Sequence, residues 1–374
     1  MTWRRTAAAV VAGTTTALAL VACGEEGAGV DGAAEPGATT ATACTAGEPT
    51  YGETDEEVAA QEVDDEALVV YSGRNEDLVG PALEQFTAST GIEVSVRYGG
   101  TPGITAQLLE EGDASPADVV ITQDAGAFGA LHQAGCLAPL PAATTERVAE
   151  EFRADGGDWA PLTGRARVVS YNTDLVTPDE VPTTLEELVD PAVASRLGVA
   201  PTNASFLAFV TAVRVLEGDE AAEDLLTGLA EGGAQTFEGN GDLVEAVADG
   251  RVDMGLLNHY YLYELQAERG ADQVPVVNAY AEDGGPLSLV NVSGAAVHTS
   301  TDRADDALAL VDHLLSDEAQ AYFAQETNEY PMVDGAPEPA DAPQLADVRA
   351  PALDLDDLAS LRETQALVDA SGLS

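Results

Sequence analysis

The chain has 374 residues, and its 66 acidic against 15 basic side chains give a formal net charge of −51 at pH 7. Its hydrophobic content of 45% is enough to bury a core, so a chain disordered throughout is excluded. Every basic residue is an arginine. Nucleic acids and anionic membrane surfaces are excluded as partners, because their binding needs clustered positive charge. The acidity indicates a solvated, salt-adapted surface.

The N-terminus has the pattern of a targeting segment. Arg4 and Arg5 precede an apolar stretch at residues 6–22, which is short for a bilayer span. The stretch ends in Leu20-Val21-Ala22-Cys23, which resembles a bacterial lipobox. We therefore predict a lipoprotein signal peptide at residues 1–22 and acylation of Cys23. A plain signal peptide or an anchor helix is the alternative.

Residues 23–66 are predicted to be an acidic, disordered tether. They are rich in Gly, Ala, Thr and carboxylates, and such a composition cannot bury enough apolar surface to become ordered. Cys44 lies in this segment and Cys136 in the folded part. The two could form a disulfide in an oxidising compartment, but their spacing does not decide it. No CxxC motif or Cys/His cluster is present in the sequence, so no metal role is predicted for them.

From about residue 67 onward, predicted strands and helices alternate. The predicted strands are 67–71, 92–98, 119–122, 168–171, 197–200, 254–257, 287–292 and 295–297. The predicted helices are one that begins after Asn75 or Asp77 and ends at Gly91, then 105–109, 206–216, one rich in Tyr, Leu and Glu that follows the strand 254–257, 304–315 and 318–325, with a mostly helical segment at 345–373. This order predicts an α/β fold around a mostly parallel sheet.

Catalytic motifs are absent from the sequence. It contains no G-x-S-x-G, H-E-x-x-H, Walker loop or G-x-G-x-x-G, and its four histidines are scattered. A surface-anchored enzyme therefore has no catalytic set to support it, and a binding protein is predicted instead.

The most specific feature is the run Asn258-His259-Tyr260-Tyr261 at a predicted strand-to-helix junction. In open α/β sheets, ligands bind at the carboxyl ends of strands, where helix N-termini also gather. A phenolate oxygen is a hard, anionic donor that suits Fe³⁺. The alternative is that both tyrosines pack at the surface with their hydroxyl groups in water.

Several runs, taken together and in order, resemble the bacterial ferric-iron-binding proteins of ABC importers. They are residues 71–76, 111–119, 163–173, 200–206, 258–261 and 328–331. The resemblance implies a two-lobed periplasmic-binding-protein fold of type II with a hinge. Lobe 1 would be residues 67–164 plus 291–342, and lobe 2 would be residues 165–290 plus 343–374. It further implies a monomer that delivers Fe³⁺ to a permease and an ATPase. The protein would be held at the outer face of the cell membrane by its lipid anchor alone, or lie in the periplasm.

The same resemblance implies a set of site residues. Tyr260 and Tyr261 match the paired tyrosinate ligands, and Tyr171 matches a third ligand of the tyrosine-rich branch. A synergistic anion, carbonate or phosphate, would complete the coordination of the iron. The positions implied for this anion are Arg165, Arg167, Asn203, Ala204, Ser205, Asn240 and Asn258.

Two departures from the family concern lobe 1. Asn75 stands where one branch has a histidine ligand, and Gln123 where it has a glutamate. Neither amide is a good ligand for Fe³⁺, so lobe 1 is expected to give no direct protein ligand, with Tyr71 as a reserve cleft contact. A receptor for sulfate or phosphate remains the alternative function, since Asn203-Ala204-Ser205 at a helix N-terminus would suit an oxyanion. It leaves the tyrosine pair unexplained.

Overall fold

The computed structural model describes residues 43–45, 58, 60–353 and 355–373. The predicted signal peptide, Cys23 and most of the predicted tether lie outside these residues. Within the described part of the chain, no helix is long and apolar enough to cross a membrane.

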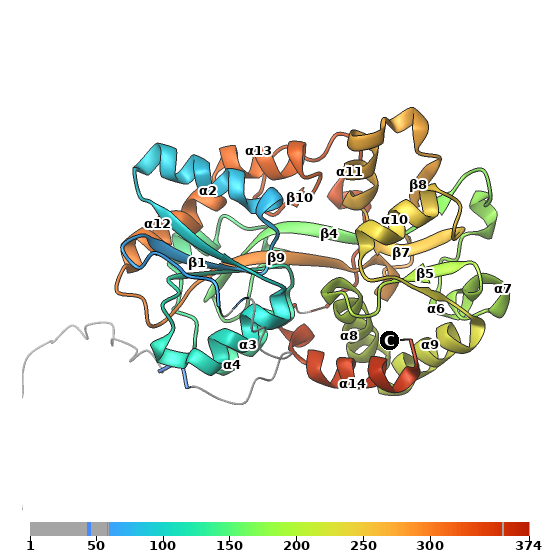
Figure 1. The fold of residues 1–374 in the computed structure, drawn as a ribbon, viewed down its shortest axis with the longest axis horizontal. Coiled ribbons are helices and arrows are strands. Elements are labelled where there is room, and N and C mark those ends of the chain that lie inside the picture. Colours follow the sequence, from blue (N-terminus) through green and yellow to red (C-terminus); the bar gives the residue numbers. More distant parts are fainter. Residues whose placement is uncertain (1–42, 46–57, 59, 354, 374) are drawn as a thin grey trace, which may run out of the picture. The chain divides into compact units, whose positions relative to one another are not determined.

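The strands follow one hydrogen-bonded path in the order β2-β1-β3-β9-β4-β7-β5-β6, with β8 and β10 paired to β4 (Figure 1). Their bounds are β1 Leu68–Ser72, β2 Val94–Tyr98, β3 Val119–Thr122, β4 Trp159–Asn172, β5 Leu197–Val199, β6 Gln235–Thr236, β7 Met254–Asn258, β8 Val276–Ala279, β9 Val290–Val297 and β10 Tyr330–Pro331. The outer strands are parallel to their neighbours, whereas β4 and β9 pair antiparallel. The sheet is therefore mixed, which corrects the prediction of a mostly parallel sheet, because β4 and β9 run antiparallel to their neighbours.

Strand β4 links the two halves of this path. It pairs with β9 from Trp159 to Ala166 and with β7 from Arg167 to Tyr171. A strand shared in this way carries the backbone from the sheet of lobe 1 into that of lobe 2. The arrangement is the α/β, two-lobed fold that was predicted.

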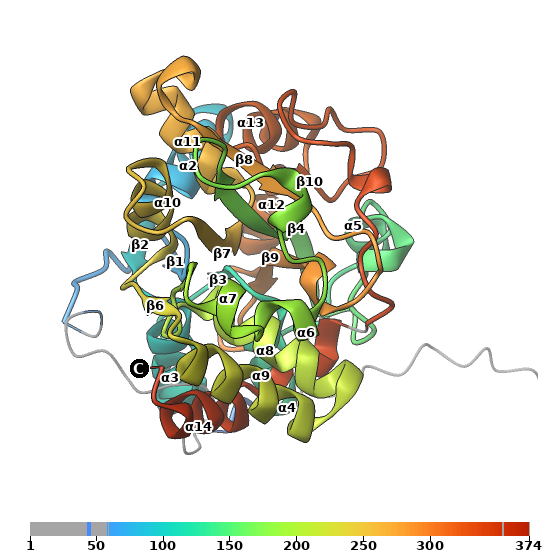
Figure 2. The ribbon, with the colours of Figure 1, turned by 90° about the vertical axis from the view of Figure 1, so that its right-hand side faces the viewer.

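The helices cover both faces of the sheet. Figures 1 and 2 show α2, α12 and α13 on one face of lobe 1 and α3 and α4 on the other, with α10 and α11 opposite α8, α9 and α14 in lobe 2. The bounds are α2 Glu76–Thr90, α3 Thr101–Glu111, α4 Ala125–Gln133, α5 Ala142–Thr145, α6 Leu185–Leu188, α7 Pro191–Ala194, α8 Ala204–Glu217, α9 Asp219–Gly232, α10 Asn240–Ala248, α11 Tyr260–Arg269, α12 Ala304–Leu314, α13 Asp317–Glu326 and α14 Leu361–Ser371. Helix α2 begins after Asn75 and ends at Gly91, whose φ of 77° is left-handed, as the sequence predicted.

Three predicted elements differ from the structure. Strand β4 has 14 residues instead of the predicted 168–171, and β9 is one strand instead of two. The break expected before residue 295 is absent: at Gly294 an added Cβ would lie 2.7 Å from Phe128 and 2.8 Å from Trp159, so the glycine permits close packing. The C-terminal segment was predicted to be mostly helical, but its α-helix is confined to Leu361–Ser371.

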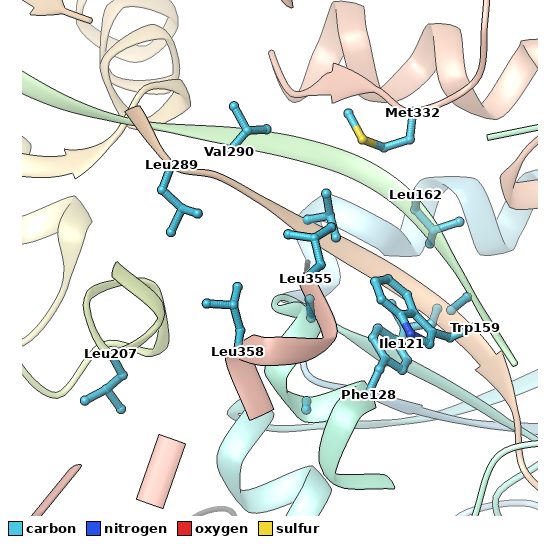
Figure 3. Close-up of a cluster of buried hydrophobic side chains, with 14 of the residues drawn as sticks. Ile121, Phe128, Trp159, Leu162, Leu207, Leu289, Val290, Met332, Leu355 and Leu358 are labelled. Carbon is cyan, nitrogen blue, oxygen red and sulfur yellow. The ribbon is translucent and has the colours of Figure 1, made fainter. Parts of the chain in front are cut away.

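The hydrophobic core continues across both lobes. Phe128 of α4 stacks on Trp159 of β4 with ring centroids 4.7 Å apart. Figure 3 shows Leu355 and Leu358, from the 3₁₀ turn Leu355–Ala359, between these rings and Leu207 of α8. This turn contacts α4 of lobe 1 as well as α8 of lobe 2.

Parts of the predicted tether are packed against the folded chain. Cys44 is buried and forms a disulfide with Cys136. Farther along, the side-chain amide of Gln61 donates to the carbonyl of Tyr98 at 2.8 Å and accepts from its N–H at 3.1 Å. The prediction of disorder through residue 66 is corrected for these residues, because a covalent bond and contacts with β2 compensate for their low apolar content.

Candidate metal and anion site

The two adjacent tyrosines lie at the junction between β7 and α11. The rings of Tyr260 and Tyr261 stack with centroids 4.3 Å apart. Tyr260 is buried and Tyr261 is half-buried. Burial and the neighbouring Tyr261 raise the pKa of Tyr260 well above its usual value, while Arg74 and Arg165 act in the opposite direction. Forming the phenolate of Tyr260 therefore requires a cation that replaces its proton.

His259 fixes the backbone at this junction. Its Nδ1 accepts the N–H of Ala166 at 3.2 Å, so its Nε2–H donates to the carbonyl of Asn328 at 2.9 Å. The imidazole stacks on Tyr330 with centroids 4.7 Å apart. Burial lowers the pKa of His259 to about 3, which keeps the ring neutral. The residue before the tyrosine pair is thus bound both to β4 and to the loop before β10.

Three buried guanidinium groups lie around the tyrosine pair. Arg165 and Arg167 come from β4, and Arg74 follows β1. Arg74 Nη2 lies 2.7 Å from a carboxylate oxygen of Glu329, and Arg165 Nε lies 3.8 Å from the other oxygen. Burial lowers the pKa of Arg74, but Glu329, Tyr260 and Tyr261 outweigh it, so the pKa is raised overall.

The guanidinium groups are only partly satisfied. Within the described residues, the Nε atoms of Arg74, Arg165 and Arg167 make no hydrogen bond although they are buried. Burial lowers the pKa of Arg167 to about 9, with Tyr261 opposing the shift. Buried N–H groups without partners are rare in folded proteins. Three buried N–H donors in this region are therefore available to a further acceptor.

The predicted oxyanion residues meet at the N-terminus of α8. Asn203 Oδ1 accepts from the N–H of Ser205 at 3.0 Å and from its hydroxyl at 2.7 Å. Asn240 Nδ2 donates to Ser205 Oγ at 2.9 Å, and Arg167 Nη2 donates to the carbonyl of Ser205. Ala204 is the first residue of α8. Asn258 is buried and lies opposite Arg167 across the β4–β7 ladder, so these residues and the tyrosine pair share one region.

Tyr171 is not brought to this region, contrary to the prediction that it is a third ligand. It lies opposite Met254, at the start of β7, whereas the tyrosine pair follows the end of β7. Four ladder positions separate Tyr171 from Arg167, which is about 13 Å at roughly 3.3 Å per residue. Tyr171 instead packs in the hydrophobic core.

Of the three residues predicted as possible cleft contacts of lobe 1, only Gln123 contacts the candidate site. The hydroxyl of Tyr71 donates to the carboxylate of Glu111 at 3.1 Å and accepts from Arg97, so its prediction as a cleft contact is corrected. Asn75 is exposed, and its side chain does not cap α2. Gln123 reaches the region through its backbone carbonyl, which accepts from Arg165 Nη2.

Arg74 and Glu329 were missed as site residues. Both stand inside the runs that carried the family resemblance, at residues 71–76 and 328–331. One signal was available: Arg74 directly follows the Ser72-Gly73 turn after a buried strand, in a chain with 15 basic residues. Only the fold shows that residues 255 positions apart form an ion pair.

Comparison with known proteins identifies the class of protein. Residues 114–361 match the family model "Bacterial extracellular solute-binding protein", and the chain belongs to this family. It is 30% identical to the "Fe(3+)-binding periplasmic protein" of Serratia marcescens over 82% of this chain and 90% of that protein. It is 33% identical to the "Major ferric iron-binding protein" of Neisseria meningitidis over 71% and 80%.

A solved structure agrees with these relatives. The fold superposes on iron-bound HitA from Pseudomonas aeruginosa with a TM-score of 0.78 and 35% identity, covering 82% of this chain and 99% of that one. Within the family, the chain therefore belongs with the ferric-iron-binding periplasmic proteins and has their type II binding-protein fold.

Proposed function

We propose that this protein captures Fe³⁺ outside the cytoplasm through the phenolates of Tyr260 and Tyr261 and delivers it to an ABC importer. The observation that carries the proposal is the stacked tyrosine pair beside three buried guanidinium groups with unsatisfied N–H donors. Phenolate oxygens suit a hard trivalent cation, and free N–H donors suit an oxyanion bound next to it.

The charges of the site support this cargo. The guanidinium groups of Arg74, Arg165 and Arg167, with the carboxylate of Glu329, leave a net charge of +2 next to neutral tyrosines. This positive charge opposes the effect of burial on the pKa of Tyr260 and disfavours a bare cation. Fe³⁺ bound by two phenolates still carries one positive charge, so an anion is needed to balance the site.

A carbonate or phosphate held by lobe 2 would meet this need. Arg167 reaches the N-terminus of α8, where Asn203, Ser205 and Asn240 form a hydrogen-bonded group. The N–H groups and the dipole of a 14-residue helix add to the attraction. Arg165 and the neighbouring Asn258 complete the proposed anion contacts.

Lobe 1 is proposed to contribute a counter-ion in place of a metal ligand. Asn75 is exposed, and the side-chain amide of Gln123 is a weak donor. Arg74, in contrast, is buried and electrostatically coupled to both tyrosines. The proposed lobes are residues 67–164 plus 291–342 and residues 165–290 plus 343–374. Their closure would pair the guanidinium group of Arg74 with the anionic iron site of lobe 2.

The cellular setting is part of the proposal. A lipid on Cys23 and the acidic segment after it would hold a monomer at the outer face of the membrane. The permease and ATPase of an importer would be its partners. The family membership and the ferric-binding relatives support this setting.

The test is to load Fe³⁺ into variants in which one tyrosine of the pair is replaced by phenylalanine. Iron-loaded protein should show the visible absorption of tyrosinate-to-iron charge transfer, and Tyr260→Phe and Tyr261→Phe should each lose most of it. The matched control is Tyr263→Phe on the same helix, whose hydroxyl lies 3.5 Å from that of Tyr280. Full colour in both single variants would contradict the proposal. A colourless wild type that binds phosphate or sulfate tightly would favour the oxyanion receptor.

A further inference from the structure

A second group of ligand-type side chains lies away from the tyrosine pair. Cys44, Cys136 and His298 are each at most 2% exposed. Both sulfur atoms and one ring nitrogen of His298 lie within 4.8 Å of one another. Cys136 follows α4 and His298 follows β9, whereas Cys44 comes from the N-terminal segment. The disulfide between the two cysteines therefore joins that segment to lobe 1.

His298 is oriented by one ring nitrogen and unsatisfied at the other. Its Nδ1 lies 2.7 Å from Ser300 Oγ, and Ser300 Oγ donates to the carbonyl of Ser115 at 3.1 Å. The backbone N–H of Ser300 donates to the same nitrogen at 3.3 Å, which requires Nδ1 to be an acceptor, whereas the hydroxyl bond to Ser115 favours a proton on Nδ1. With either tautomer, Nε2 is buried and has no hydrogen-bond partner among the described residues.

Such an imidazole has the features of a metal ligand. Histidines that bind metals commonly use their second nitrogen in a hydrogen bond that fixes the ring, as Ser300 does here. Burial lowers the pKa of His298, against the influence of Glu111, Asp113 and Asp118, so the ring is neutral and a cation at Nε2 would have at most one ring proton to displace.

The disulfide prevents the sulfur atoms from acting as strong ligands. A thiol reductant would supply two electrons and two protons, its own sulfurs becoming a disulfide while Cys44 and Cys136 become thiols. Loss of both thiol protons to a bound cation would leave two thiolates and a neutral imidazole. This donor set suits Zn²⁺ and similar cations, whereas Fe³⁺ prefers oxygen donors.

We propose that reduction converts Cys44, Cys136 and His298 into a site for a thiophilic divalent cation of the Zn²⁺ class. Asp113 holds Cys44 in place, because its Oδ1 accepts the backbone N–H of Cys44 at 2.8 Å. The cation would hold the N-terminal segment against lobe 1 when the disulfide is absent. A small disulfide would take up the two electrons, its own S–S bond breaking to two thiolates as the Cys44–Cys136 bond forms, and the cation would be released, so the two links exclude each other.

Cobalt(II) is the probe for the test, because its thiolate complexes absorb in the near ultraviolet and Zn²⁺ is silent. The full chain is stripped of metal and reduced with a phosphine under anaerobic conditions, with circular dichroism recorded before titration. We expect one Co²⁺ per chain with thiolate-to-cobalt absorption in the reduced protein, none in the oxidised protein, and loss of the band when Zn²⁺ is added.

Variants separate this site from adventitious binding. His298→Gln should weaken Co²⁺ binding by more than the ten- to hundredfold typical of losing an outer hydrogen-bond partner, and Ser300→Ala by about that amount. Cys136→Ser should abolish the band, and the control His132→Gln, at an exposed histidine, should leave it unchanged. The proposal is wrong if the reduced protein shows no cobalt–thiolate band, loses its native circular dichroism, or binds Co²⁺ equally well after His298→Gln.

Discussion

At the scale of single residues, the surroundings of a side chain decide its chemistry. Tyr260 and Tyr261 are neighbours in sequence, yet Tyr260 is buried beside Arg165 and His259 while Tyr261 is half-buried. Burial keeps Tyr260 protonated in the absence of a metal. A cation that binds there must displace a tightly held proton, so under the proposed function protons and iron would compete for the same oxygen.

Arg74 is expected to support both stability and iron binding. Removing one partner of a buried ion pair typically costs about 3–5 kcal/mol, because the other charge stays buried and unpaired. Arg74→Gln should therefore lower the free energy of unfolding of the iron-free protein by about 3 kcal/mol, measured with urea. It should also weaken Fe³⁺ binding by at least about tenfold.

A second substitution distinguishes the two effects of Arg74. The double variant Arg74→Gln/Glu329→Gln removes both charges and should recover much of the lost stability without recovering iron affinity. The control Arg196→Gln, at a half-buried arginine paired with Glu180 and Asp253, should leave iron binding unchanged. Equal iron affinity in Arg74→Gln and wild type would show that lobe 1 contributes no counter-ion.

His259 should make the iron-free protein sensitive to acid. Its pKa is about 3 in the fold and about 6.5 when unfolded, so below pH 6.5 the unfolded chain binds the extra proton. The stability that this group contributes is full above pH 6.5 and declines as the pH falls toward 3. Between pH 7.5 and 5 the loss should be about 2 kcal/mol. Urea unfolding of wild type and His259→Gln at both pH values checks this, and an identical loss in both would contradict it.

At the scale of elements, the ends of strands and the N-termini of helices lie together at the candidate site. Strand β7 ends at Asn258 and α11 begins at Tyr260, while α8 begins at Ala204 beside Arg167 of β4. Backbone N–H groups at a helix N-terminus have no partner within the helix, so these starts are suited to anions. Strand β4 supplies two arginines to the same region because residues i and i+2 share one face of a strand.

The N-terminus of α8 should determine which anion accompanies iron. A hydrogen bond to a charged group contributes about 1.5–3 kcal/mol, so Ser205→Ala should weaken anion-dependent iron binding by about tenfold or more. Ferric titrations without added anion, with bicarbonate and with phosphate measure the effect, and Ser89→Ala, at an exposed serine of α2, is the control. Anion dependence that survives in Ser205→Ala would place the anion elsewhere.

At the scale of the whole molecule, three connections join the two lobes. Strands β4 and β9 run side by side at the crossing, and the 3₁₀ turn Leu355–Ala359 packs against α4 and α8. Its leucines fill the space between aromatic residues of lobe 1 and helix α8 of lobe 2 (Figure 3). Movement of one lobe relative to the other must therefore rearrange this packing.

Truncating the buried leucine of this turn should destabilise the protein. Leu358 is fully buried, and replacing a buried leucine with alanine typically costs about 2–5 kcal/mol. Leu358→Ala should lower the free energy of unfolding by that amount, measured by urea unfolding of the iron-free protein. Leu175→Ala is the control, because Leu175 is 45% exposed. A change below about 0.5 kcal/mol in Leu358→Ala would show that the turn is not part of the core.

Local patterns in the sequence were sufficient for much of the fold and for part of the site. Short apolar runs such as 119–122, and stop signals such as Gly91, specify an element by its own residues. The tyrosine pair and the Asn203–Ser205 run were predicted as site residues for the same reason, since each is contiguous, and they remain predictions. The long strand β4 was underestimated because Pro161, Gly164 and its arginines interrupt the apolar pattern.

Contacts between distant residues were decided by the tertiary structure alone. The register of β4 against β7 places Tyr171 away from the tyrosine pair. The hydroxyl of Tyr71 is hydrogen-bonded to Glu111. Both residues had the correct type and a plausible position in the sequence. The Arg74–Glu329 ion pair and the Cys44–Cys136 disulfide join residues far apart in the chain. The physical reason is that a side chain's identity fixes which bonds it can form, whereas its partner depends on which distant backbone segments pack beside it.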